Sequence, residues 1–140
     1  MTDSASTITE IKEGQLVLAR LIPADVAWKS GLGFFSEDSD FIQVGVWGYD
    51  AGKQLKAHIH NPVSREVPWT QEVLYVRRGQ ISAAVYNTQE QVVANLIVNE
   101  GDVIILLRGG HGYEILQDGT QVLEVKNGPY VGADLDRRRL

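Results

Sequence analysis

Three histidines are the residues of this sequence with the clearest capacity for chemistry: His58, His60 and His111. His58 and His60 form a His-x-His pair inside a strand-like segment, residues 54–60. Successive side chains of a β-strand point to opposite faces, so two residues separated by one lie on the same face, about 7 Å apart. Two neutral imidazoles on one face can bind a single divalent cation. Because such a pair also arises by chance, the residues around it decide the interpretation.

The surroundings of the pair follow a recognisable spacing. Gly52 is followed by five residues, His58, one residue and His60, and further along Glu72 is followed by six residues and Gly79. Together these resemble the first motif of the cupin family, in which Gly, His, His, Glu and Gly follow one another at fixed spacings. The sequence is therefore similar to cupins in both halves of that motif.

A second stretch, residues 101–115, is similar to the second cupin motif in a degraded form. Gly101 and Gly109 match, but Leu107 stands where the family has Pro. His111 comes one residue early relative to Gly109, and Ile115 stands where Asn is usual. The resemblance spans roughly residues 41–125, which is most of the chain.

The resemblance implies a metal site. In a cupin barrel His58, His60, Glu72 and His111 meet in the interior and hold one divalent ion, with one or two coordination positions left open. This ligand set suits Fe, Mn, Zn, Ni or Cu without selecting among them. An open position can take water, oxygen or a chelating substrate, so oxygen insertion and metal-assisted isomerisation are both expected for a small polar metabolite, such as a sugar derivative.

One departure from the family concerns the carboxylate. His60 and Glu72 are separated by eleven residues, whereas cupins have three or four there, so residues 61–71 are interpreted as a loop insertion. That insertion contains a rival carboxylate, Glu66. We prefer Glu72 as the ligand because six residues separate it from Gly79, as in the cupin motif. Glu66 is the minority alternative as a ligand and is also a candidate catalytic group.

Other side chains are candidates for substrate contact or proton transfer. Tyr113 shares a strand face with His111 and is either a general acid or a core tyrosine with a satisfied hydroxyl. Arg65 and Arg108 carry guanidinium groups that suit an anionic substrate, although most loop arginines are only solvated. Trp69, in the insertion, is the best candidate for contact with a substrate from a lid.

The elements that must position these residues are short strands separated by Gly, Asp, Asn and Pro. The apolar alternation predicts strands over residues 15–22, 41–49, 54–60, 72–76, 80–86, 92–98, 102–107, 113–116 and 121–125. Strands of this length and spacing, without an amphipathic helix of three turns, are typical of an all-β sandwich or barrel. We expect an all-β fold: a single-domain cupin, or jelly-roll β-barrel, over residues 15–130. Residues 1–14 form an N-terminal tail or arm, and residues 131–140 a basic C-terminal tail.

Composition limits the function classes. The chain has 140 residues, a net charge of −5 and no cysteine. Net acidity argues against a nucleic-acid or membrane surface, and the lack of cysteine excludes disulfides and thiolate sites. No signal pattern or membrane span is visible, which favours a cytoplasmic protein. Because cupins often use an arm such as residues 15–22 to dimerise, we expect a homodimer with a small-molecule ligand.

Two other functions remain open at this point. The first is a metal-free sugar-nucleotide epimerase or isomerase. Some enzymes of this class resemble the cupin fold, and here His58 or His60 would be the general base. A non-enzymatic cupin that binds or senses a small molecule is the second alternative. Fold alone does not choose among these chemistries.

Overall fold

The structure is a computed structural model that describes residues 6–140 and is almost entirely β. The described part contains the strands β1 (Thr9–Glu13), β2 (Leu16–Ile22), β3 (Gly31–Phe34), β4 (Gly45–Gly48), β5 (Glu72–Arg78), β6 (Gln80–Tyr86), β7 (Val92–Asn99), β8 (Val103–Leu106), β9 (Gly110–Ile115) and β10 (Gln121–Lys126), and the short helix α1 (Ala133–Asp136). The predicted all-β fold class is confirmed.

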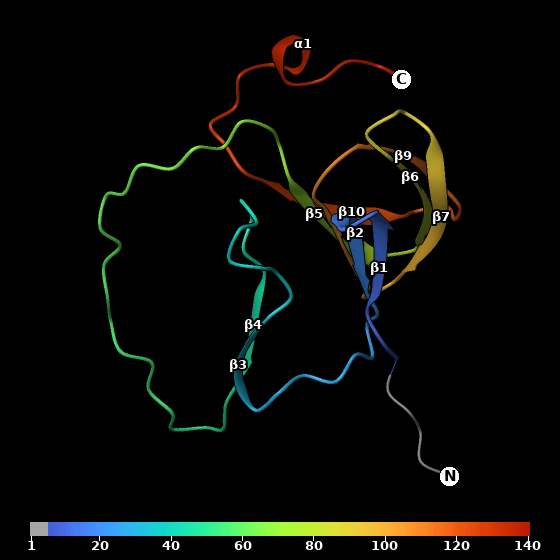
Figure 1. Ribbon diagram of the computed structural model, residues 1–140. Coiled ribbons are helices and arrows are strands. Elements are labelled where there is room, and N and C mark those ends of the chain that lie inside the picture. The colour runs from blue at the N-terminus through green and yellow to red at the C-terminus, as the bar shows by residue number, and fades with distance from the viewer. Residues whose placement is uncertain (1–5) are drawn as a thin grey trace.

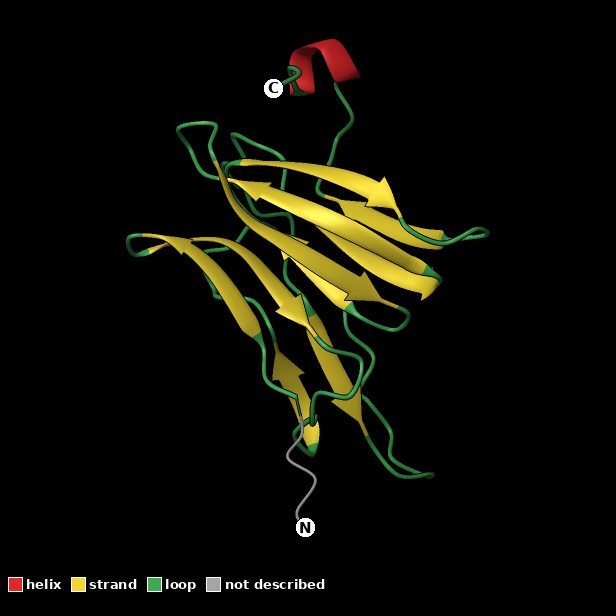
Figure 2. Ribbon diagram, turned by 90° about the vertical axis from the view of Figure 1, so that its right-hand side faces the viewer, coloured by secondary structure: helices red, strands yellow, loops and turns green. Residues whose placement is uncertain are grey.

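Two antiparallel sheets form the body of the molecule (Figures 1 and 2). One has five strands in the order β1-β2-β8-β5-β10, and the other has three in the order β7-β6-β9. Their facing side chains make one core, to which β2, β5 and β8 contribute from one sheet and β6 and β7 from the other. In β6 the alternation is clear, because Ile81, Ala83 and Val85 are buried and their neighbours are less so. A period of two is what a strand with one face in a core requires.

The outer face of the five-stranded sheet is covered by residues 35–44. Ile22, Ile105 and Leu107 pack there against Ile42 in a second apolar cluster. The buried side chain of Gln71 fastens this cover, since its Oε1 accepts the backbone N–H groups of residues 41 and 42 at 2.8 and 3.2 Å. Residues 35–44 therefore lie on the side of this sheet away from the main core.

Residues 35–44 connect β3 to β4, two strands that extend away from the large sheets. β3 and β4 pair only with each other as a two-stranded ribbon, and residues 51–69, named here the strap, run as an extended loop without helix or strand. Figure 1 shows the strap as a wide green arc beyond β3 and β4, away from the two large sheets. Every residue of the strap is exposed.

Several boundaries differ from the sequence prediction. The predicted strand over residues 54–60 is wrong, because that segment lies in the strap, and the strand predicted over 41–49 is confined to β4. A strand pattern becomes a strand only beside a hydrogen-bonding partner, and within residues 6–140 this segment has none. The implied barrel is not closed either: each sheet in the described part has free edges. β1, inside the predicted tail, pairs with β2, and residues 1–5 lie outside the described part.

Among residues 6–140, no helix is long and apolar enough to cross a membrane.

Candidate functional site

A carboxylate and an imidazole from different sheets meet at one end of the sandwich. Glu72 is the first residue of β5, and His111 lies in β9. The Nε2 atom of His111 is 2.7 Å from Oε1 of Glu72, and the Glu72 residue is only 4% exposed. The alternation of β5 places Glu72 on the face of the buried Leu74 and Val76, which is why its charge points toward the interior. A buried carboxylate needs such a donor, since burying it unpaired is costly.

Two further donors complete the surroundings of Glu72. The Tyr113 hydroxyl donates to Oε1 of Glu72 at 2.9 Å, and Nζ of Lys126 lies 3.7 Å from Oε2. The rings of His111 and Tyr113 lie beside each other with centroids 5.3 Å apart. As predicted, His111 and Tyr113 lie on the same face of their strand. His111 pairs with Val85 and Tyr113 pairs with Ala83, and both of these β6 residues are buried in the core.

These contacts set the acidity of Glu72. Burial acts to raise its pKa, but the hydrogen bond and charge of His111 act against it, followed by the hydroxyl of Tyr113 and the charge of Lys126. The net result lowers the pKa of Glu72 from 4.5 to about 2. Glu72 is therefore a carboxylate at neutral pH and an acceptor for every donor around it.

Tyr113 is shifted in the opposite sense. Burial, and then the negative charge of Glu72 and the hydrogen bond to it, raise the pKa of the Tyr113 phenol well above its ordinary value. The tyrosine thus keeps its proton at neutral pH and acts as a hydrogen-bond donor.

His58 and His60 lie elsewhere. Both are exposed residues of the strap, and their rings stand edge to face with centroids 5.0 Å apart. In the part of the chain that the structure describes, no group of three or more His, Asp and Glu side chains is placed to hold a metal ion. Of the four predicted metal ligands, Glu72 and His111 are in contact, and His58 and His60 lie apart from them on the strap.

The predicted substrate contacts divide into two groups. Arg65 and Glu66 are exposed on the strap. Trp69 and Arg108 contact each other, with the guanidinium 3.8 Å from the centre of the indole, and Nε1 of Trp69 donates to the carbonyl of Leu107 at 2.9 Å. They border a hollow of about 330 Å³ whose lining includes neither Glu72 nor His111. Trp69 and Arg108 are therefore brought together, but away from the carboxylate.

Lys126 is the site residue that the sequence analysis missed. It ends β10 and pairs in register with Glu72 of β5, which brings an ammonium group beside the carboxylate. That register joins segments more than fifty residues apart in the sequence, and the only local signal was a lysine one position beyond a predicted strand.

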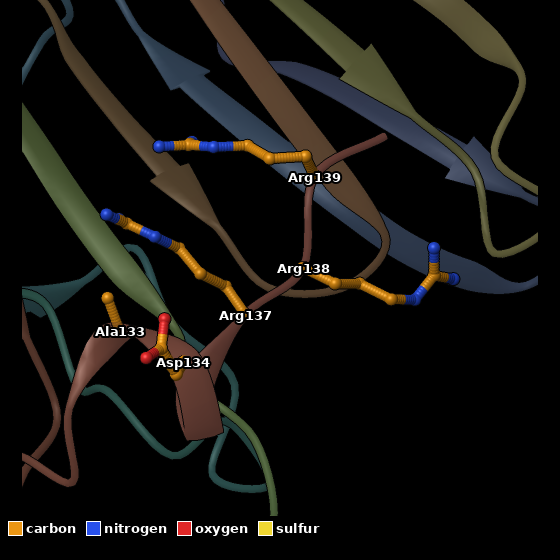
Figure 3. Close-up of a pocket in the computed structure, with 5 residues that line it drawn as sticks. All are labelled: Ala133, Asp134, Arg137, Arg138 and Arg139. Carbon is orange, nitrogen blue, oxygen red and sulfur yellow. The ribbon is translucent and has the colours of Figure 1, made fainter.

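The basic C-terminal segment borders another hollow, of about 270 Å³. Figure 3 shows Arg137 and Arg139 extending to one side of the chain and Arg138 to the other, so the three guanidinium groups do not converge. Arg138 forms an ion pair with Glu90 of the same chain. This arrangement offers no focused site for an anion.

No family model matches the chain, and no curated protein or solved structure matches it either.

Proposed function

We propose that this protein is a jelly-roll protein of the cupin type that binds one divalent metal ion through His58, His60, Glu72 and His111 and acts on a small polar metabolite. One observation carries the proposal: the 2.7 Å contact between the imidazole of His111 and the carboxylate of Glu72. These are one residue from each of the two motifs that resemble the cupin pattern, and they face each other across two sheets.

The chemistry of the donors fits a divalent first-row metal. Imidazole nitrogen and carboxylate oxygen suit Fe, Mn, Zn, Ni and Cu, and the chain has no thiolate to compete. Glu72 is ionised and His111 is close enough to bind the same ion. His58 and His60 lie apart from this pair, on the exposed strap, so binding of the same ion by all four residues requires the strap to move toward Glu72 and His111.

Residues of this chain also prepare the ligands. Tyr113 and Lys126 hold the carboxylate of Glu72 in place, as groups that contact metal ligands commonly do. A bound ion would supply Lewis acidity and open positions for a substrate or oxygen.

The decisive experiment measures metal in the purified protein by mass spectrometry, after loading with each ion and removing the excess. We expect about one equivalent per chain, lost in His111→Ala and in His58→Ala/His60→Ala. Glu124→Gln is the matched control, because Glu124 lies beside Lys126 but makes no contact with His111. A wild-type protein that retains no metal after loading with all five ions refutes the proposal.

A second function is favoured by the hydrogen bond from Tyr113 to Glu72. A histidine oriented by a carboxylate, next to a protonated tyrosine, is the arrangement of a general base and a general acid. It would support a metal-free isomerase or epimerase acting on a sugar derivative, with His111 rather than His58 or His60 as the base. Turnover of a sugar nucleotide that survives complete chelation and is lost in Tyr113→Phe would favour this function. Turnover lost on chelation and restored by metal would exclude it.

A further inference from the structure

The hollow of about 330 Å³ beside Trp69 and Arg108 borders the cover formed by residues 35–44. Its walls come from three parts of the chain: the start of β2, residues 37–41 of the cover, and the residues around Trp69 and Arg108. Neither Glu72 nor His111 lines it. Hollows of a few hundred Å³ with apolar walls and a few polar groups are typical binding sites for small molecules. This hollow is thus a second candidate site, separate from the contact between Glu72 and His111.

Trp69 is a fixed wall of the hollow, although it is the last residue of the exposed strap. Its Nε1 donates to the carbonyl of Leu107 at 2.9 Å, and the centre of the Phe41 ring lies 4.6 Å from the centre of the indole. The residue nevertheless remains 38% exposed. Because the indole is already held in one orientation, a ligand that packs on its open part does not have to immobilise it.

The buried side chain of Gln71 joins two of the walls. Its Oε1 accepts the backbone N–H groups of Phe41 and Ile42, and its Nε2 donates to the carbonyl of Leu107 at 3.2 Å. The same carbonyl accepts the hydrogen bond from Trp69. The wall with Phe41 and the wall with Trp69 are therefore held at a fixed separation, as in a preformed ligand site.

Arg108 brings a positive charge to the hollow. Its guanidinium lies 3.8 Å from the centre of the Trp69 indole, and the residue is exposed. Within residues 6–140 no carboxylate lies at ion-pair distance from Arg108, whereas Arg20 in the same lining contacts Asp40 at 2.8 Å and Glu10 at 3.4 Å. A guanidinium held against an indole keeps a planar set of N–H donors that fits a carboxylate. Of the two arginines in the lining, Arg108 is the one that can pair with an anionic ligand.

The other charges of the lining limit the kind of anion. Glu37 and Asp40 balance Arg20 and Arg108, so these four side chains carry no net charge. A surface without an excess of positive charge does not favour a polyanion such as a nucleic acid. Apolar side chains from the start of β2 and from the cover complete the walls. A ligand with one negative group and an apolar body matches both the single available cation and these walls.

We infer that this hollow binds a small organic monoanion. The carboxylate of the ligand pairs with Arg108, and its apolar or aromatic body packs against Trp69, Phe41 and Leu16. This binding goes beyond the proposed function and does not depend on a metal ion at Glu72 and His111.

Two simple carboxylates serve as probes for the wild-type protein. The first, 3-phenylpropionate, has an aromatic body, and the second, 4-methylpentanoate, has a branched aliphatic body. We expect isothermal titration calorimetry to give one site per chain for at least one of them, with a Kd of about 1 mM. The corresponding primary amide, which has nearly the same shape without the charge, is expected to bind at least about tenfold more weakly. Absence of saturable binding for both carboxylates, or equal binding of a carboxylate and its amide, overturns the inference.

The fluorescence of Trp69 shows whether the probe occupies the hollow. The chain has three tryptophans, and Trp28 and Trp47 are 57% and 58% exposed, so Trp28→Phe/Trp47→Phe leaves Trp69 as the single reporter. We expect the carboxylate that binds in calorimetry to change this fluorescence with the same Kd. Binding in calorimetry that leaves the fluorescence of Trp69 unchanged would place the ligand elsewhere and overturn the inference.

Two substitutions in the lining test the contacts independently. Arg108→Gln removes the cation, and Leu16→Glu adds a negative charge at a position that is 40% exposed at the start of β2. We expect each to weaken binding of the carboxylate at least about tenfold. Leu16→Glu keeps the test decisive if Arg108→Gln disturbs Trp69. Arg65→Gln is the matched control, because Arg65 is an exposed arginine of the strap and does not line the hollow.

A substitution in the other site separates the two locations. His111→Ala is expected to bind the carboxylate as the wild type does, because His111 does not line the hollow. Binding that is lost in His111→Ala and kept in Arg108→Gln would assign the anion to the site of Glu72 and His111 and overturn the inference. Equal weakening by Arg65→Gln and Arg108→Gln would do the same, since it would show only a general effect of charge.

Discussion

His111 lies 2.7 Å from Glu72 although their strands, β9 and β5, belong to different sheets. The contact therefore ties the two layers of the sandwich together at one end. It also places an ionised carboxylate and an imidazole next to the free edge of β9. Stability and the proposed chemistry consequently depend on the same pair.

Acid stability is the first expected consequence. The pKa of Glu72 is lowered from 4.5 to about 2, so between these values the unfolded chain takes up a proton that the folded chain does not. The stabilising contribution is complete above about pH 4.5 and is lost as the pH falls toward 2. We expect the free energy of unfolding of Glu72→Gln to fall less steeply than that of the wild type between pH 4.5 and 2. The free energy of unfolding, measured with urea at a series of pH values, reports it. Wild-type and variant curves that run parallel over this window would contradict the assignment, and Glu124→Gln serves as the control.

Tyr113→Phe removes one hydrogen bond to a buried charge. We expect a loss of about 2 kcal/mol in the free energy of unfolding at neutral pH, together with a higher pKa of Glu72. Tyr75→Phe is the control, because Tyr75 points to the opposite face of β5 and should change stability by less than about 0.5 kcal/mol. Equal effects of the two substitutions would mean that the hydrogen bond contributes nothing.

The strands were predictable where the signal is local. β6 has the predicted bounds, and β2, β7 and β10 lie within a residue of theirs, because apolar alternation ended by Gly-containing turns needs only nearby residues. Glu72 and His111 were both named as ligands of one site, from two separate motifs that resemble the cupin pattern, and the structure has these two side chains in contact.

The predictions that failed concern residues whose structural partners are distant in the sequence. Residues 54–60 have the alternation of a strand, but a strand forms only beside another strand with a free edge. The alternation does not identify that partner strand. Lys126 reaches Glu72 through the register of β10 on β5, which local sequence does not specify.

Gly79 tests the turn that ends β5. Its φ is +88°, and a methyl group there would meet the Cα of Thr120 at 2.8 Å. Gly119 has a φ of +73° with no atom within 4 Å, so it isolates the cost of the backbone conformation. We expect Gly119→Ala to cost about 1 kcal/mol, and Gly79→Ala to cost about 1–3 kcal/mol more because of the collision. Thermal or urea unfolding of both variants measures the difference, and equal costs would show that Thr120 moves aside freely.

Arg20 tests how the cover of the five-stranded sheet is held. The residue is only 5% exposed in β2, and its guanidinium contacts Asp40 at 2.8 Å and Glu10 at 3.4 Å. Asp40 belongs to residues 35–44, which connect β3 to β4 of the ribbon. Arg20→Leu leaves the carboxylate of Asp40 without its cation, and breaking a buried pair in this way costs about 3–5 kcal/mol.

The partner substitution separates the ion pair from simple packing. Arg20→Leu/Asp40→Leu removes both charges, so we expect it to be less destabilised than Arg20→Leu alone, even though it carries one more substitution. Arg138→Ala breaks an exposed pair with Glu90 and should change stability by less than about 0.5 kcal/mol. Urea unfolding of these three variants and of Asp40→Leu measures these differences. If the double variant loses the sum of the two single losses, Arg20 and Asp40 do not interact, and the apolar cluster around Ile42 alone holds the cover.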